Sequence, residues 1–196
     1  MKLSDELEAW RATDGELSLQ SLTSVFRERS FAIAFAVLLA LPALPLPTAG
    51  ATHAFEAIAI LLACEMIAGR GSIWLPRRWR QVTLDGERGQ RILSGLIALT
   101  RRLERFTRPR LSGTFRRRAS TVAFGTLVIA GALGAFAAPP FSGLDTLPSL
   151  GVVLLSLAVL FEDALIALLA IALLATGIAL EIALGSAAIS ALATLA

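Results

Sequence analysis

Uncharged apolar segments are the feature that most constrains the fold of this chain. Residues 119–138 are twenty consecutive residues without a charged side chain, and residues 164–185 are apolar apart from Glu181. A helix needs about 20 apolar residues to cross the hydrocarbon core of a bilayer. Hydrophobic residues make up 56% of the chain, whereas a soluble domain has about 45–50% even when glycine is counted. The sequence therefore predicts an all-α integral membrane protein.

Two other apolar segments, residues 31–46 and 54–69, are short for an upright span. The turn between them is rich in proline, with Pro42, Pro45 and Pro47. Proline ends or breaks a helix because it lacks the amide hydrogen and clashes with the preceding turn. This pattern predicts a re-entrant hairpin or, alternatively, a thin two-helix hairpin held within a bundle. Non-helical backbone at that depth has to be covered by protein or line a water-filled cavity.

The second half of the chain shows the same hairpin pattern. The apolar residues 119–138 end at Pro139 and Pro140, and a shorter apolar run covers residues 150–161. Short matches between the halves indicate an internal repeat; they pair Phe26-Arg27-Glu28-Arg29 with Phe115-Arg116-Arg117-Arg118, Ala34-Phe35 with Ala123-Phe124, and Pro47-Thr48-Ala49-Gly50 with Pro140-Phe141-Ser142-Gly143. Paired, proline-interrupted helices are typical of transporters that bind their substrate near the midplane. The alternative is that any two hydrophobic hairpins look alike.

Basic charge is concentrated between the hairpins. Residues 70–118 carry fourteen arginines and three acidic side chains, whereas residues 119–196 contain no Lys or Arg. In residues 90–108 the apolar side chains occupy one arc of a helical wheel and the arginines the opposite arc, which predicts an amphipathic helix lying in the membrane interface. The positive-inside rule places residues 70–118 in the cytoplasm. A role in nucleic-acid binding is a weaker explanation, because these arginines flank apolar segments on both sides.

Tryptophan and arginine side chains of the basic segment are candidate contacts to anionic lipid headgroups, where such side chains anchor membrane proteins. These candidates are Trp74, Arg77, Arg78, Trp79, Arg101, Arg102, Arg105 and Arg110.

The organisation that follows has five segments. We expect polar and amphipathic N-terminal helices in residues 1–29, a first membrane hairpin in 30–69, an arginine-rich cytoplasmic loop with the basic interfacial helix in 70–118, a second hairpin in 119–161, and a C-terminal transmembrane helix and tail in 162–196.

Acidic side chains inside or beside the apolar segments are candidates for an intramembrane or hairpin-tip polar site, because an unpaired carboxylate is costly in a bilayer. The candidates are Glu65, Asp145, Glu162, Asp163 and Glu181. For Glu65 the alternative is a position near a helix end, paired with an arginine such as Arg70. Glu56 lies about half a turn round the helix from Glu65, so the two do not form one dyad. We expect Glu56 in a first helical turn, which the helix dipole favours.

Small residues recur every fourth position in the C-terminal segment, at Ala175, Ala179, Ala183, Ala187 and Ala191. This spacing lets two membrane helices approach closely. We expect it to serve packing within the bundle or in a homodimer.

Several kinds of catalytic and metal chemistry find no support in the residues. Cys64 and His53 are the only cysteine and histidine, which is too few for a zinc site. No Ser-His-Asp set surrounds a credible nucleophile elbow, and there is no Walker loop. We therefore expect no metal, no cofactor and no enzyme activity, while a carboxylate-only mechanism stays open.

Several motifs resemble those of the bacterial ExoD exopolysaccharide-synthesis family. The resemblance spans residues 17–185 and rests on Leu41-Pro42-Ala43-Leu44-Pro45-Leu46-Pro47 with Gly50, Trp74-Leu75-Pro76-Arg77-Arg78, Arg101-Arg102-Leu103-Glu104-Arg105 with Pro109-Arg110-Leu111, Pro140-Phe141, Pro148 and Glu162-Asp163. Asp145 and Ala164 depart from the pattern, in which an uncharged polar residue and glycine are expected. The resemblance implies an inner-membrane protein that affects exopolysaccharide production and tolerance of alkaline conditions. It implies no reaction.

Three functions fit these observations. The first is a non-enzymatic, transporter- or channel-like element of exopolysaccharide production. The second is a structural or lipid-interacting partner of the polysaccharide synthesis proteins. The third is a carboxylate-dependent lipid-carrier enzyme, which would rest on Glu65, Asp145 and Glu162-Asp163.

Overall fold

The fold is a bundle of long helices. The computed structural model describes residues 5, 8–9, 12, 19–44, 52–70, 94, 98, 101, 117–138 and 143–195. The helices that it defines are α2 (Leu19–Ala40), α3 (His53–Ile67), α6 (Arg118–Ala137), α7 (Thr146–Phe161) and α8 (Ala164–Leu195). Within this part of the chain the prediction of an all-α protein is confirmed.

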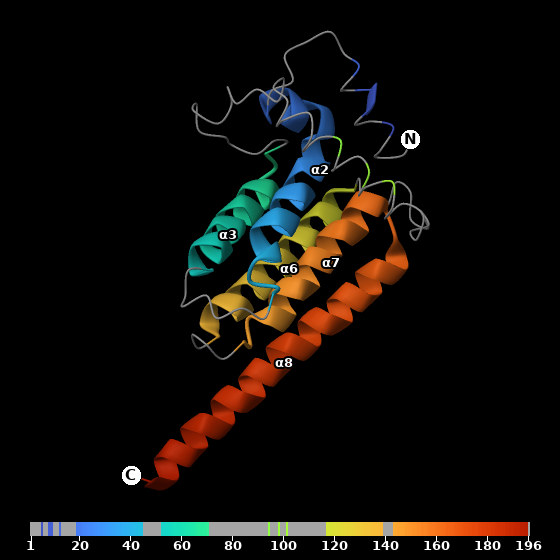
Figure 1. Ribbon diagram of the computed structural model, residues 1–196. Coiled ribbons are helices and arrows are strands. Elements are labelled where there is room, and N and C mark those ends of the chain that lie inside the picture. The colour runs from blue at the N-terminus through green and yellow to red at the C-terminus, as the bar shows by residue number, and fades with distance from the viewer. Residues whose placement is uncertain are drawn as a thin grey trace.

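The helices run alternately up and down the bundle (Figure 1). α2 and α3 form one hairpin, α6 and α7 form another, and α8 returns along α7. We call the end with Arg29, Arg70 and Arg118 the arginine end. The opposite end, where the hairpin turns at residues 41–44 and 143–145 lie, is the tip end.

The hairpins pack crosswise. α2 packs most extensively on α7, and α3 packs most extensively on α6. α7 also makes a long contact with α8. Each hairpin therefore buries its apolar surface mainly against the other hairpin rather than within itself.

The core between the hairpins is apolar. Phe31, Phe35 and Leu39 of α2 and Val128 of α6 are completely buried. The rings of Phe35 and Phe124 meet edge to face with centroids 5.7 Å apart, the geometry that the aromatic quadrupole favours. This core fills the middle of the bundle between the two ends.

Glycines set the distance between α7 and its neighbours. A methyl group at Gly151 would lie 3.0 Å from the Cα and N atoms of Leu174, so α7 and α8 nearly touch at the backbone. At Gly177 of α8 a methyl group would lie 2.8 Å from Cδ of Pro148. Small residues allow such close approach of helices.

The helix boundaries differ from the predictions in two places. The amphipathic residues 18–29 and the apolar run from residue 31 form one continuous helix, because nothing between them interrupts the helical backbone. α7 begins at Thr146, four residues before the apolar run of residues 150–161 from which the second helix of this hairpin was expected. Pro148 did not prevent this, because the first helical turn has no internal partner for its amide hydrogens.

Two helices, α6 and α8, are long and apolar enough to cross a membrane. The most apolar stretch of α8 is only 17% buried, and Leu168, Leu169 and Ile182 are 64%, 66% and 68% exposed. A core helix of a soluble protein would be buried on such faces. Length, composition and exposure together indicate a membrane protein.

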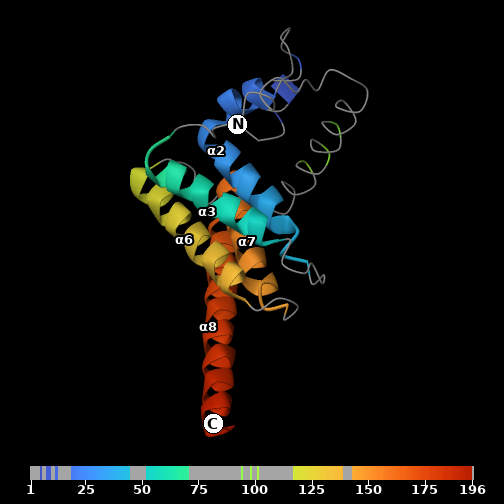
Figure 2. The ribbon, with the colours of Figure 1, turned by 90° about the vertical axis from the view of Figure 1, so that its left-hand side faces the viewer.

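The far part of α8 projects beyond the rest of the bundle (Figure 2). Ala175, Ala179, Ala183 and Ala187 are exposed, so packing of this alanine face within the described bundle is excluded. Its use in a homodimer stays a prediction. The predicted interfacial helix over residues 90–108 and the Trp-Arg anchor before it lie outside the described residues, apart from residues 94, 98 and 101.

The close contact of α7 and α8 gives a stability prediction. We expect Gly151→Leu to lower the free energy of unfolding by about 1–3 kcal/mol, because the added side chain overpacks this contact. The matched control is Gly185→Leu, since nothing lies within 4 Å of a methyl group there. The control should be neutral or stabilising by less than about 1 kcal/mol, because glycine is a poor helix former. Thermal unfolding in detergent measures both, and equal effects would contradict the packing described.

Candidate functional site

A histidine and a carboxyl group pair at the tip end of α3. Nδ1 of His53 and Oε2 of Glu56 lie 2.8 Å apart. The Glu56 side chain is completely buried, whereas that of His53 is 30% exposed. The second carboxyl oxygen of Glu56, Oε1, is buried without a hydrogen-bond partner. The pair therefore links a buried carboxyl group to the surface.

The local sequence explains the pair. His53 and Glu56 both lie in the first turn of α3 and are three residues apart, so they share a helix face. The ring of His53 also packs against that of Phe136 on α6, with centroids 4.9 Å apart. The prediction that Glu56 lies in a first helical turn is confirmed. Its complete burial was not predicted.

Two more carboxyl groups face the same region. Asp145 precedes α7, and Glu181 lies on α8. Pro148, three residues after Asp145, lies against α8 one turn before Glu181, since a methyl group at Gly177 would lie 2.8 Å from its Cδ atom. A methyl group at Gly134 of α6 would lie 3.1 Å from Oε2 of Glu181, so the missing side chain of this glycine leaves the space that the carboxyl group occupies.

Unpartnered oxygens accumulate in this region. Oε1 of Glu181, Oγ1 of Thr146 and Oγ of Ser149 are buried without hydrogen-bond partners, as is Oε1 of Glu56. Ser149 is completely buried. Buried polar atoms are usually paired, so a concentration of unpartnered oxygens marks a candidate site. We call His53, Glu56, Asp145 and Glu181 the tip cluster.

No fixed positive charge on the helices neutralises the tip cluster. Residues 30–40 of α2 and 119–137 of α6 contain no titratable side chain, and residues 119–196 contain no Lys or Arg. Among the described residues no set of three His, Cys, Asp or Glu side chains is placed to hold a metal ion. The three carboxyl groups of the cluster therefore have no arginine or lysine partner on the described helices, and burial of an uncompensated charge is costly in a largely apolar bundle.

The arginine end contains the other predicted acidic residues. Arg29 of α2 donates from Nη2 to Oε1 of Glu162 at 3.1 Å, and the two side chains are 25% and 18% exposed. Glu162 ends α7 with a φ of 53°. Asp163 accepts a hydrogen bond at Oδ1 from the N–H of Leu165 at 2.9 Å and so caps the start of α8.

Glu65 also lies at the arginine end. Its Oε1 accepts a hydrogen bond from Nη1 of Arg70 at 2.9 Å, which confirms the alternative of an arginine partner near a helix end. Its Oε2 is buried without a partner. Nearby, Nη2 of Arg118 donates to the carbonyl of Ile67 at 2.9 Å. Glu65 therefore belongs to the polar contacts that finish α3 and begin α6.

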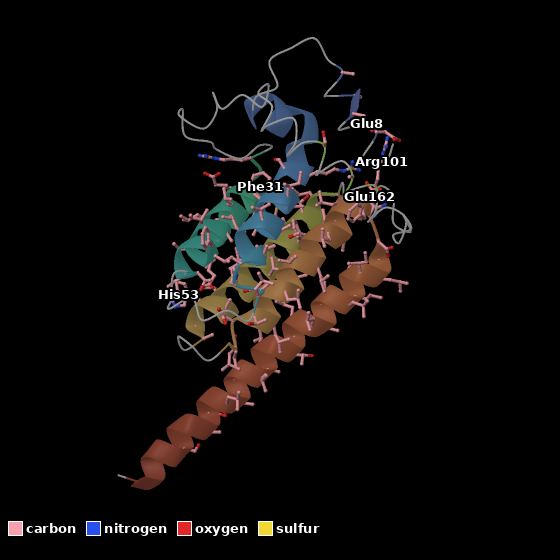
Figure 3. All side chains as sticks on the ribbon, viewed as in Figure 1. Glu8, Phe31, His53, Arg101 and Glu162 are labelled. Carbon is pink, nitrogen blue, oxygen red and sulfur yellow. The ribbon has the colours of Figure 1, made fainter. Side chains whose placement is uncertain are left out.

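The structure divides the predicted acidic residues into two groups. Asp145 and Glu181 lie at the tip end, while Glu65, Glu162 and Asp163 lie at the arginine end; Figure 3 shows His53 and Glu162 at opposite ends of the bundle. The carboxyl groups proposed for a lipid-carrier enzyme therefore do not form one site. Sequence reasoning missed His53 and Glu56. The sequence contained a signal for both: the only histidine of the chain lies three residues before a glutamate, at the start of an apolar helix.

Of the residues predicted to contact lipid headgroups, the structure describes one, Arg101. Arg101 donates from Nη2 to Oε1 of Glu8, and both side chains are largely exposed. The basic segment thus meets the acidic N-terminal segment at this point (Figure 3). The other seven predicted lipid-contact residues lie outside the described residues.

Comparison with known proteins gives one family and one relative. A family model described as "Exopolysaccharide synthesis, ExoD" matches residues 3–183. The uncharacterized protein slr1875 of Synechocystis sp. is 26% identical over 168 residues, which cover 84% of this chain and 78% of that protein. No solved structure matches the chain.

The Arg29–Glu162 contact gives a second prediction. We expect a double-mutant cycle of Arg29→Ala and Glu162→Ala to show a coupling of about 1 kcal/mol, because this hydrogen-bonded ion pair is partly buried and joins the two hairpins. Chemical unfolding of the four proteins in detergent measures it. The matched pair is Glu65 and Arg70, where greater exposure should reduce the coupling to a few tenths of a kcal/mol. Additive effects at Arg29 and Glu162 would show that the contact does not stabilise the fold.

Proposed function

Since the chain belongs to the ExoD family of exopolysaccharide-synthesis proteins, we propose that it is a multi-pass inner-membrane protein that acts as a transporter- or channel-like element in exopolysaccharide production. Family membership itself implies involvement in exopolysaccharide synthesis. The single observation that carries the transport proposal is the tip cluster, with buried, unpartnered carboxyl oxygens on α3 and α8, two helices that both pack against α6. An intramembrane carboxyl group without a cationic partner is costly and is typical of an ion or substrate pathway.

The crosswise hairpins support the proposal. α2 and α6 have 22 and 20 residues, and α3 and α7 have 15 and 16. The long helix of each hairpin packs on the short helix of the other, an arrangement expected of two repeats related by a pseudo-two-fold axis. We propose that the hairpins are structural repeats, and transporters commonly place their site where such repeats meet.

The depth of the tip cluster supports short, re-entrant hairpins. From Ala164 to Glu181 α8 rises roughly 26 Å, and its candidate span continues for roughly another 9 Å to Ala187. Glu181 therefore lies inside the far edge of this apolar span, away from its middle. Although α6 is long enough to cross a membrane, we propose that both hairpins enter the bilayer from the arginine end and that their tips end below the opposite surface. The tip cluster then lies below that surface rather than at the midplane.

A buried apolar core separates the arginine end from the tip cluster. Phe31, Phe35 and Phe124 are buried between that end and the tip cluster, and Arg29 joins α2 to Glu162 at the end of α7. We propose that this end faces the cytoplasm, because arginines are retained on that side of the membrane. The structure then corresponds to a state closed toward the cytoplasm, in which only the tip end gives access to the cluster.

The remaining roles are proposals of the same kind. We propose that the protein catalyses no reaction itself, that its basic segment contacts anionic lipid headgroups, and that it works beside the polysaccharide synthesis proteins, as a homodimer. None of these roles requires the tip cluster. They would hold for a structural or lipid-interacting partner too, so the cluster is where the transport proposal is tested.

Polysaccharide output tests the transport proposal. In a strain lacking the native gene, we expect Glu181→Gln to leave exopolysaccharide output at the level of the deletion, because the carboxyl group of the proposed pathway is lost. The matched control is Glu65→Gln, which removes a carboxylate paired with Arg70 at the arginine end and should restore output. Protein levels in the membrane are measured for both variants. Full output from Glu181→Gln at normal protein level would refute a pathway through the tip cluster.

A further inference from the structure

The tip cluster contains more acidic oxygens than the described helices can partner. Oε1 of Glu56 and Oε1 of Glu181 are both buried without a hydrogen bond. The His53 ring beside Glu56 packs on Phe136 of α6, and Glu181 lies beside Gly134 of the same helix. If all three carboxyl groups were ionised, the negative charges would repel in a poorly solvated region. Protonation of one carboxyl group removes a charge and supplies a donor where only acceptors are present.

Among the described residues, no lysine or arginine lies at the tip end to neutralise these carboxyl groups. α3 packs on α6 and α2, and at the tip end these two helices present no titratable side chain. α7 presents Asp145, and α8 presents Glu181 itself. The only described group that can carry positive charge here is His53, on the same turn as Glu56. The described arginines of the helices, such as Arg29 and Arg118, belong to the opposite end.

A metal ion fits the tip cluster less well than a proton does. Hard cations such as Ca²⁺ take six to eight oxygen ligands, and Mg²⁺ requires near-octahedral coordination. Among the described residues no three His, Cys, Asp or Glu side chains converge closely enough to hold a metal ion. A proton requires only one acceptor oxygen, and two unpartnered ones are available at Glu56 and Glu181.

We infer that the tip cluster is a proton-binding site, in which the buried carboxyl groups of Glu56 and Glu181 each take up an exchangeable proton and His53 connects Glu56 to water. The inference rests on the proposed function for its place in a membrane transport element, and it names the ion that the element binds.

His53 has the geometry of a relay. Its ring is partly exposed, while Glu56 is completely buried, and only 2.8 Å separates Nδ1 from Oε2. A hydronium ion gives a proton to Nε2 and leaves as water; Nδ1–H breaks, and an O–H bond forms at Oε2 of Glu56. The imidazole ends neutral in its other tautomer, the carboxylate ends as a carboxylic acid, and no electron is transferred. Histidine is suited to such proton shuttling.

Infrared difference spectroscopy tests the site directly. The full chain is reconstituted in phosphatidylethanolamine–phosphatidylglycerol vesicles and titrated between about pH 5 and 9, a range in which buried carboxyl groups exchange protons. We expect a protonated-carboxyl band that loses most of its amplitude in Glu56→Gln and in Glu181→Gln. The matched control, Glu65→Gln at the arginine end, should keep the band.

Two further variants extend the test, one for the case that Glu56→Gln does not fold and one for the role of His53. If Glu56→Gln does not fold, Gly134→Val changes no charge but fills the space beside Oε2 of Glu181, and the band should shift or weaken. His53→Gln should keep the equilibrium amplitude but slow the rise of the band after a pH jump, and added imidazole should restore the rate. A rate unchanged in His53→Gln would remove His53 from the pathway and overturn the relay.

Other outcomes would overturn the proton site. These are a band that survives both Glu56→Gln and Glu181→Gln, the absence of any protonated carboxyl group across the range, and the loss of the band on addition of Na⁺ at constant pH, which would assign the site to a metal cation. The proposed function fails separately. If a variant loses the protonated-carboxyl band but restores polysaccharide output, the assignment of the proton site stands and the proposed transport pathway through the tip cluster is refuted.

Discussion

The crosswise packing of the two hairpins determines where every polar group of the bundle lies. Because α2 packs on α7 and α3 on α6, the starts and ends of the helices are brought together in two layers separated by an apolar core. The arginines and their carboxylate partners form one layer. Carboxyl groups without arginines form the other. Close approach at Gly151 and Gly177 holds α8 against this arrangement, and α8 thereby brings Glu181 to the second layer.

The separation of the layers has an electrostatic consequence. Paired charges at the arginine end are partly exposed and already neutralised, so little is gained there by binding another ion. The tip cluster is more buried, and its three acidic residues have no arginine or lysine beside them on the described helices, which is why we propose that it takes up a proton. The arginine end and the tip end thus differ in their capacity to bind an ion, although both contain ordinary acidic residues near helix ends.

Much of the fold could be predicted from the sequence, because it follows from local pattern. Uncharged runs and prolines predicted α3, α6 and most of α8. The length of an apolar run and the helix breakers at its ends are properties of one segment and can be seen without knowing its neighbours. The joining of residues 18–29 to the apolar run in one helix, and the start of α7 at Thr146, were missed. At both places the sequence signal for a helix boundary is weak, and packing against the neighbouring helices decides whether the helix continues.

The site was harder to predict than the fold. Asp145 and Glu181 were expected as polar-site residues, but so were Glu65 and Glu162, and hydropathy does not say which acids meet across the bundle. Glu65 has Arg70 five residues away, a local partner that the sequence already offered. Glu56 was taken as a helix-start residue, which it is. Its burial depends on which face of α3 turns toward its neighbours, and a single sequence does not fix that orientation.

The difference in length between the hairpins and α8 connects the tip cluster to the lipid itself. The 32 residues of α8 rise roughly 48 Å, whereas α3 and α7 have half as many residues. A bilayer thin enough to suit the hairpins brings the tips to its surface and requires α8 to tilt, whereas a thick one covers the tips with acyl chains. With the re-entrant hairpins proposed above, membrane thickness would control whether water reaches His53. The mismatch in length between α8 and the hairpins would thus make access to the tip cluster depend on lipid composition.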